Sequence, residues 1–135
     1  MIVADASVVV DMLLGGGSEA GDELATRFQT GQTICAPHLI DAEVAQVLRR
    51  FVLQGSLTSR AAAARVADLV DLPIQRFPHT SLITRALELL QNVTVYDGLY
   101  LVLAEVLDAP LLTGDKALAK VPGCRATVRV VATGG

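Results

Sequence analysis

The sequence predicts a layered α/β domain with a short, mostly parallel central sheet flanked by helices. Short apolar runs alternate with longer segments whose apolar residues recur at helical spacing. Glycines and prolines separate these segments. At 135 residues and 52% hydrophobic composition, the chain has enough apolar material for one core. We therefore expect a single domain over residues 1–135.

The first half of the chain is expected to alternate strands and helices. In order, we expect a strand at 2–4, helices at 7–14 and from 18 or 22 to 31, a strand at 33–36, and helices at 38–54 and 58–70. Ser7 and Thr58 can cap the helices that follow them. The glycines at 15–17 break the first helix, and Gly55 ends the long one. The last two helices should form an antiparallel hairpin.

The second half continues the same alternation. We expect a strand at 72–77, helices at 80–91 and 96–107, a strand at 110–113 and a possible edge strand at 127–131. Pro73 is tolerable only near the start of a strand or on a sheet edge, because it lacks a backbone N–H. In a parallel sheet the carboxyl ends of the strands and the starts of the following helices meet at one edge.

Four acids fall at that edge. Asp5 and Asp115 follow the strands at 2–4 and 110–113, Glu43 lies early in the helix at 38–54, and Asp97 opens the helix at 96–107. Four neighbouring carboxylates repel one another at neutral pH, and a hard divalent cation compensates that repulsion. The sequence therefore predicts a metal site made of these acids.

Each acid also has a purely structural interpretation. Asp97 and Asp115 precede apolar helical segments and could be N-caps, and Asp5 could bond the amides of the turn at Ser7. Glu43 lies inside a helix among apolar neighbours, where capping does not explain it. Capping and metal binding both stay open for the three aspartates.

Helical geometry separates other acids from this group. Asp41 is two positions from Glu43, about 200° around the helix, and should be solvated. Glu105 is eight residues from Asp97, about 12 Å along the helix, and should form an ion pair or support the site indirectly. The remaining acids near the first two helices are expected to favour helix starts or lie on the surface: Asp11, Glu19, Asp22 and Glu23.

Other polar and aromatic residues are assigned supporting or structural roles. Ser7 and Thr113 lie near Asp5 and Asp115 and could orient them or hold a water molecule. Neither hydroxyl has a neighbouring histidine, because His38 and His79 begin helices elsewhere, so a covalent nucleophile is not expected. The side chains expected to pack are Tyr96 and Tyr100, and the isolated thiols expected to carry no chemistry are Cys35 and Cys124.

These motifs together resemble a known nuclease family. The segments that carry the resemblance are Asp5-Ala6-Ser7, the helical Glu43, Tyr96-Asp97-Gly98-Leu99-Tyr100 and Thr113-Gly114-Asp115. In this order they resemble the acidic constellation of the PIN-domain ribonucleases, and most of all the VapC-type toxins of toxin–antitoxin pairs. The resemblance extends to about Lys120.

The resemblance implies a three-layer PIN-like fold and an endoribonuclease that depends on Mg²⁺, for which Mn²⁺ can substitute. It implies that Asp5, Glu43, Asp97 and Asp115 are both catalytic residues and metal ligands. It further implies RNA as substrate, 5′-phosphate products, a homodimer, and inhibition by a cognate antitoxin whose C-terminal segment reaches the acids. Which RNA is cut is not encoded in any recognisable motif.

Charge and hydropathy limit the partners. The net charge of -3 argues against a broad basic surface, but a metal site can contact phosphate without one. The candidates for RNA backbone contacts are Arg49, Arg50, Arg65 and Arg85. The hairpin at 38–70 carries more apolar surface than the sheet can cover, so part should face a second subunit or an antitoxin helix. No signal peptide or membrane span is recognisable, so a cytoplasmic protein is expected.

Two alternatives belong to other functional classes. A receiver-like signalling domain also gathers acids around Mg²⁺, but it needs an acid at the end of its third strand, where this chain has Gln75-Arg76-Phe77-Pro78. A binding module with a PIN fold and no catalysis is the second alternative. Retention of all four acids argues against it.

Overall fold

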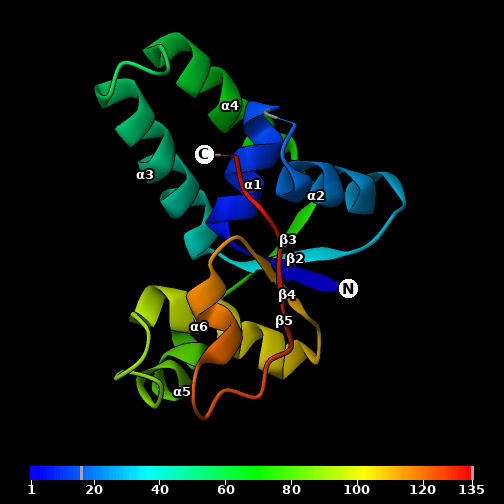
Figure 1. The fold of residues 1–135 in the computed structure, drawn as a ribbon, viewed down its shortest axis with the longest axis vertical. Helices are drawn as coiled ribbons and strands as arrows, with labels where there is room; N and C mark the ends of the chain where they lie inside the picture. Colours follow the sequence, from blue (N-terminus) through cyan, green and yellow to red (C-terminus); the bar gives the residue numbers. More distant parts are fainter. Residues whose placement is uncertain (16, 135) are drawn as a thin grey trace.

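The computed structural model describes residues 1–15 and 17–134, and its centre is a five-stranded sheet in which every pairing is parallel (Figure 1). The strand order is β3-β2-β1-β4-β5. The strands are β1 (Ile2–Ala4), β2 (Ile34–Pro37), β3 (Ile74–Phe77), β4 (Leu111–Thr113) and β5 (Val128–Val130). The predicted parallel α/β sheet is confirmed, and the possible strand at 127–131 is the edge strand β5. Gly16, part of the predicted helix break, and Gly135 lie outside the described residues.

Two helical layers cover the sheet (Figure 1). One layer contains α1 (Ala6–Leu14), α2 (Glu19–Gln29), α3 (Leu39–Leu53) and α4 (Ser59–Asp71). The other contains α5 (Ile83–Leu87) and α6 (Val95–Leu107), and α6 contacts β1, β2 and β4. This is the predicted three-layer arrangement, and α3 and α4 form the predicted hairpin, visible as two arms projecting from the sheet in Figure 1.

Side-chain caps explain where several helices begin. Ser18 caps α2 and Thr58 caps α4, because each side-chain oxygen accepts a hydrogen bond from a backbone N–H of the first turn. The expectation that Ser7 caps α1 is wrong. Asp5 occupies the cap position, since its carboxylate accepts from the backbone N–H groups of Ser7 and Val8. Gly15 ends α1 with a φ of 62°, a left-handed conformation that glycine adopts without strain.

Residues 80–91 do not form the continuous α-helix that the sequence predicted. The segment begins as a 3₁₀ turn, η1 (Thr80–Leu82), and becomes α-helical only over α5. Beyond α5, the N–H groups of Leu89 and Leu90 donate to carbonyls three residues earlier, which is the pattern of 3₁₀ turns. Leu89, in these tighter turns, is buried in the core.

The core lies on both faces of β1. Ile2, Val3 and Ala4 are fully buried, as expected for a central strand of a parallel sheet covered by helices on both sides. From α6, Tyr100, Leu101 and neighbouring residues fill the layer opposite α1. In the part of the chain that the structure describes, no helix combines the length and the apolarity needed to cross a bilayer.

Candidate functional site

The four acids predicted from the sequence lie around the carboxyl ends of the sheet strands. Asp5 follows β1 directly, and Asp115 follows β4, the neighbour of β1. The chain leaves β1 toward β2 on one side and returns to β4 on the other, so the strand order reverses between β1 and β4. Crevices at such reversal points are the usual binding sites of open α/β sheets. We call Asp5, Glu43, Asp97 and Asp115 the acidic edge.

Asp5 is the most buried acid of the acidic edge, with 7% of the residue exposed. One carboxylate oxygen, Oδ1, accepts hydrogen bonds from the Ser7 backbone N–H at 3.1 Å, the Ser7 hydroxyl at 2.5 Å and the Val8 N–H at 3.4 Å. The other oxygen accepts from the Thr113 hydroxyl. Burial raises the pKa of Asp5, and these hydrogen bonds oppose that rise. The structure thus places the hydroxyls of Ser7 and Thr113 where they orient Asp5.

Glu43 extends from α3 toward α6. Its Oε1 accepts a hydrogen bond of 2.6 Å from the hydroxyl of Tyr100, which is 1% exposed. Burial raises the pKa of Glu43, the Tyr100 hydrogen bond opposes the rise, and the charges of Asp97 and Asp5 add to it. The pKa of Tyr100 is raised, first by burial and then by Glu43. Sequence patterning identified Tyr100 only as a packing residue, because nothing local links positions 43 and 100.

Asp97 and Asp115 lie closer to solvent. Asp97 is in the first turn of α6, but Thr94 caps that helix, so the expectation that Asp97 is a cap is wrong. Burial raises the pKa of Asp97, and repulsion from Asp115 raises it further. Asp115 caps the 3₁₀ helix η2 (Lys116–Lys120) by accepting a 2.9 Å hydrogen bond from the Ala117 N–H. The capping role of Asp115 is therefore confirmed, and its second carboxylate oxygen takes no part in this hydrogen bond.

The loop between β4 and Asp115 is built around Gly114. Its N–H donates to the Ser7 hydroxyl at 3.0 Å, and the Asp115 N–H donates to the Thr113 hydroxyl at 3.0 Å. A Cβ at position 114 would lie 2.3 Å from Cγ2 of Thr133, so the C-terminal segment leaves no space for a side chain there. Gly114 thus permits the close approach that connects the Asp5 and Asp115 sides of the acidic edge.

None of the four acids pairs with Arg, Lys or His in residues 1–15 and 17–134. Their oxygen donors match the preference of Mg²⁺ or Mn²⁺, and a bound cation would relieve the repulsion that raises the pKa of Glu43 and Asp97. Over the described ranges, however, no three His, Cys, Asp or Glu side chains are close enough to hold one ion between them. The donor chemistry fits a divalent cation, and ligation by three of these acids requires their side chains to turn toward one another.

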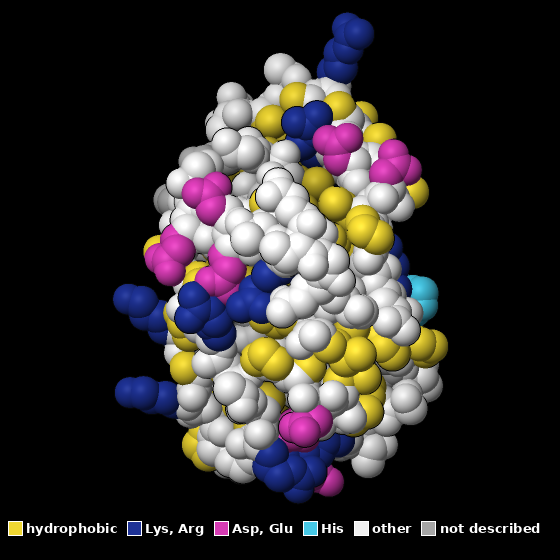
Figure 2. All heavy atoms as spheres, turned by 90° about the vertical axis from the view of Figure 1, so that its right-hand side faces the viewer, with side chains coloured by type: hydrophobic (Ala, Val, Ile, Leu, Met, Phe, Trp, Pro, Cys, Tyr) yellow, Lys and Arg dark blue, Asp and Glu magenta, His cyan; other side chains and the backbone are white. Residues whose placement is uncertain are grey.

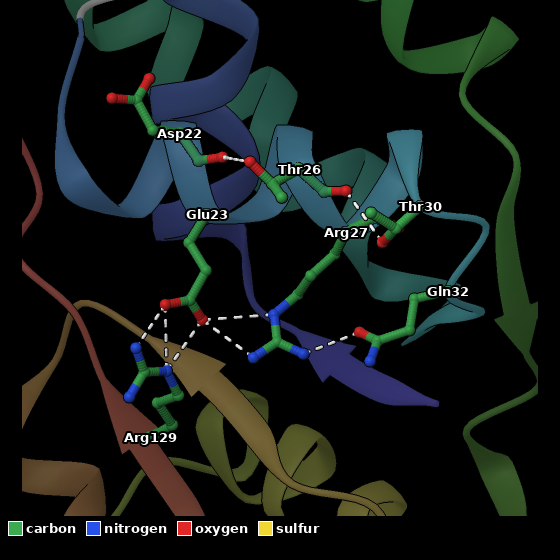
Figure 3. Close-up of polar contacts among 7 residues, drawn as sticks. All are labelled: Asp22, Glu23, Thr26, Arg27, Thr30, Gln32 and Arg129. Atoms are coloured by element: carbon green, nitrogen blue, oxygen red, sulfur yellow. Dashed lines mark hydrogen bonds and ion pairs between the residues drawn. The ribbon is translucent and has the colours of Figure 1, made fainter.

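Five acids elsewhere in the described part of the molecule have arginine partners: Glu23, Asp41, Asp68, Glu88 and Glu105. Glu23 accepts hydrogen bonds from Arg27 on α2 and from Arg129 on β5 (Figure 3). These bonds lower the pKa of Glu23, with Arg129 contributing most. Glu105 pairs with Arg85 at 3.0 Å, which confirms the predicted ion pair and lowers the pKa of Glu105.

Asp41 is partly solvated as expected, with 43% of its side chain exposed, and it also pairs with Arg76, which was not expected. It accepts both Nε and Nη2 hydrogen bonds of Arg76 on β3, the shortest at 2.8 Å. The face of α3 rotated away from Glu43 therefore borders both solvent and the edge strand β3. Asp11 accepts a hydrogen bond from the Gly134 N–H, a contact between the first helix and the C-terminal segment.

The candidate RNA-contacting arginines divide into two groups. Arg65 pairs with Asp68, and Arg85 pairs with Glu88 and Glu105, so neither is freely available to phosphate. Within the described ranges Arg49 and Arg50 of α3 form no ion pair, and both are exposed. Figure 2, which views the side bearing α2, shows acidic and basic side chains intermixed on that face without a broad basic area.

The aromatic and sulfur side chains follow the sequence predictions with one exception. Tyr100 packs in the core as predicted, whereas Tyr96 is exposed, so its expected packing role is wrong. His38 and His79 begin α3 and η1 as predicted. Cys35 and Cys124 are free thiols, and Cys35 is fully buried.

A family model described as the PIN domain matches residues 2–123. The chain therefore belongs to the PIN-domain family, which excludes the receiver-like alternative. Within that family it groups with the VapC proteins. It is 44% identical over 131 residues to "Ribonuclease VapC1" of Mycobacterium tuberculosis, covering 96% of each chain, and 36% identical over 132 residues to "Ribonuclease VapC12" of the same organism, covering 98% of this chain and all of the relative.

The fold also matches a solved structure of low sequence identity. The crystal structure of VapBC2 from Rickettsia felis, bound to a DNA fragment from its promoter, aligns with a TM-score of 0.70 at 14% identity, covering 97% of this chain and 99% of the other. This likeness supports the fold alone.

Proposed function

We propose that this protein is a toxin of the VapC type, an endoribonuclease that hydrolyses RNA at the acidic edge with Mg²⁺ or Mn²⁺ as cofactor. The relatives named as ribonucleases at 44% and 36% identity support ribonuclease activity for this chain. The single observation that supports the location is the set of four acids at the strand-order reversal between β1 and β4 that have no basic partner among the described residues.

We infer that Asp5, Glu43, Asp97 and Asp115 would hold the metal. When bound, a divalent cation lowers the pKa of a water ligand and neutralises charge on the phosphate oxygens. Ser7 and Thr113 hold the Asp5 carboxylate in a fixed orientation through their hydroxyls. Such supporting hydrogen bonds usually affect metal affinity or activity about 10- to 100-fold.

Arg50 is the best-placed of the candidate backbone contacts. It lies seven residues beyond Glu43 on α3, which is 20° short of two full turns and about 10 Å along the helix. It therefore projects from nearly the same helix face as Glu43, in the direction away from the sheet. An RNA strand crossing the acidic edge toward α3 would meet the Arg50 guanidinium at its backbone.

An antitoxin and a homodimer are proposed as protein partners. An apolar groove of about 270 Å³ runs between α3 and α4, lined by residues that include Leu48, Val52 and Val66. Leu53, Val66 and Val70 expose apolar side chains on the same hairpin. We propose that an antitoxin helix covers this groove, and that a second copy of the chain covers apolar surface elsewhere. Copurification with the antitoxin and sedimentation of the free toxin test these two assemblies separately.

Cleavage mapping tests the catalytic proposal. The purified protein is incubated with total RNA and Mg²⁺ or Mn²⁺, and the 5′ ends of the fragments are sequenced. Asp97→Asn should abolish defined cleavage. Asp108→Asn is the matched control, because Asp108 is exposed at the other end of α6 with a left-handed φ of 49° that asparagine tolerates. Parent protein that produces no metal-dependent ends would favour the non-catalytic binding module.

A further inference from the structure

Tyr96 is the one aromatic residue that the core does not take up. Its side chain is 60% exposed, whereas Tyr100 is buried and the three phenylalanines are partly buried against the core. All five aromatic residues of the chain lie in the described ranges. An aromatic ring in water forgoes the burial that normally offsets its hydration cost. A tyrosine left in this state is more consistent with a binding role than with a packing role.

The position of Tyr96 relates it to the acidic edge. It precedes Asp97 in the first turn of α6 and lies four residues before Tyr100, so the two tyrosines share one face of the helix a turn apart. The Tyr100 hydroxyl contacts Glu43, which shows where that face points. Helical side chains lean toward the helix N-terminus, and the N-terminus of α6 opens at the acidic edge. The Tyr96 ring therefore starts from the same helical turn as Asp97, at the end of α6 nearest the acidic edge, and is exposed to solvent.

We propose that Tyr96 is a specificity-determining residue whose ring stacks on an unpaired base next to the scissile phosphate. This inference rests on the proposed RNA cleavage at the acidic edge. The acids and their cation would address the phosphate, which every nucleotide carries, and they offer no surface to a base. Stacking on an exposed aromatic ring supplies that surface and requires a base that is not already paired in a duplex. The proposed substrate is consequently a single-stranded or looped RNA segment.

Binding can be measured without cleavage because the chain contains no tryptophan. Tyr96→Trp introduces a single indole at the proposed stacking position. In the presence of a chelator, single-stranded oligonucleotides should quench its fluorescence, whereas a blunt duplex and a strand of abasic nucleotides should not. Equal quenching by the abasic strand, or no quenching by oligo(A) or oligo(U), would overturn the stacking proposal.

Kinetics with a mapped substrate give the second test. Tyr96→Ala should raise KM for RNA about tenfold with a smaller change in kcat, and Tyr96→Phe and Tyr96→Trp should retain KM, because a stacked base contributes roughly that much to binding. Val106→Ala is the control, since Val106 is 66% exposed on the same helix but near its other end. Circular dichroism melting verifies that each variant is folded.

The outcomes distinguish this inference from the proposed function. If the parent cleaves RNA and Tyr96→Ala keeps the parent KM, the stacking role is wrong and the nuclease proposal stands. If the parent cleaves no RNA, the proposed function itself fails. If Tyr96→Ala changes the sedimentation coefficient and the KM of the remaining monomer is that of the parent, the ring belongs to an interface between copies and the stacking role is overturned.

Discussion

Asp5 and Glu105 are two acids with little exposed side-chain surface that are in opposite electrostatic states. Asp5 is 7% exposed and the Glu105 side chain is 6% exposed. Glu105 contacts the Arg85 guanidinium, and its pKa is lowered. Asp5 receives only neutral hydroxyl and amide donors, and its pKa is raised. Burial is the main cause of the raised pKa of Asp5, whereas at Glu105 the hydrogen bond from Arg85 outweighs the effect of burial.

This comparison separates acids that stabilise the fold from acids that are available to a ligand. Glu23, Asp41 and Glu105 each join distant elements through an arginine. The acidic edge contains charges of one sign that repel one another pairwise, which costs stability unless a cation compensates them. Uncompensated acids of this kind are more typical of functional sites than of structural ones.

The largest effect should come from neutralising one acid of each kind: Asp97 of the acidic edge, and Glu105, which pairs with Arg85. Asp97→Asn should reduce RNA cleavage by more than about 100-fold and leave the metal-free protein at least as stable as the parent, because it removes repulsion. Glu105→Gln should leave kcat unchanged and lower the free energy of unfolding by about 1–3 kcal/mol, because Arg85 loses its charged acceptor. Single-turnover cleavage and urea denaturation measure the two quantities. A folded Glu105→Gln variant that loses cleavage would contradict the division between acids that stabilise the fold and acids that are available to a ligand.

Metal binding in the absence of RNA should also distinguish the acids of the acidic edge from the acids that pair with arginine. Binding to the native state alone adds about 2.7 kcal/mol at a hundredfold excess of ion over Kd, which corresponds to several degrees in Tm for a domain of this size. Mn²⁺ should therefore raise the Tm of the parent and of Glu105→Gln equally, and that of Asp97→Asn less. Differential scanning fluorimetry with and without chelator measures the shift. A parent Tm that millimolar Mn²⁺ leaves unchanged would argue against a cation at the acidic edge.

The carboxylates of Glu105 and Asp97 should contribute to stability with opposite dependence on pH. The pKa of Glu105 is lowered from 4.5, so its stabilising contribution is present above that value and is lost as pH falls through the folded pKa. The pKa of Asp97 is raised from 3.8, so its carboxylate destabilises the fold increasingly as pH rises through the raised value.

Urea titrations between about pH 3 and pH 7 should then diverge for the two variants. The deficit of Glu105→Gln relative to the parent should grow as pH rises, and so should the advantage of metal-free Asp97→Asn. Parallel curves for the parent and Asp97→Asn would show that the Asp97 pKa is not raised.

The smallest effect concerns the loop that joins the two halves of the acidic edge. Gly114→Ala places a Cβ against Cγ2 of Thr133 and should reduce cleavage several-fold with a modest loss of stability, since the loop or the C-terminal segment must shift. Thr133→Ser removes that methyl group. The double variant Gly114→Ala/Thr133→Ser should therefore recover cleavage that Gly114→Ala alone loses, and a double-mutant cycle measures the coupling.

The sequence predicted the architecture well where local pattern determines it. Apolar runs and capping residues such as Thr58 mark element boundaries within the chain itself. The convergence of Asp5 and Asp115 followed from the parallel sheet, because strand ends in such a sheet share an edge. Sequence spacing also predicted correctly that Glu105 forms an ion pair.

Contacts between distant positions were not predictable in this way. The partner of Asp41 is Arg76, 35 residues away on another element, and no local signal connects them. The bond from Tyr100 to Glu43 spans 57 residues and was missed for the same reason. The helix expected at 80–91 failed because helical spacing does not separate an α-helix from successive 3₁₀ turns that bury the same leucines.

The central position of β1 has a consequence for the synthesis of the protein. Asp5 is synthesised before the rest of the acidic edge, and the Thr113 hydroxyl that binds its carboxylate is 108 residues later in the chain. Until β4 emerges, β1 lacks the neighbour on one of its sides and the acidic edge lacks Asp115. A nascent chain that stops before β4 thus carries its first catalytic candidate without the others. The acidic edge can therefore assemble only after the ribosome has made β4 and Asp115.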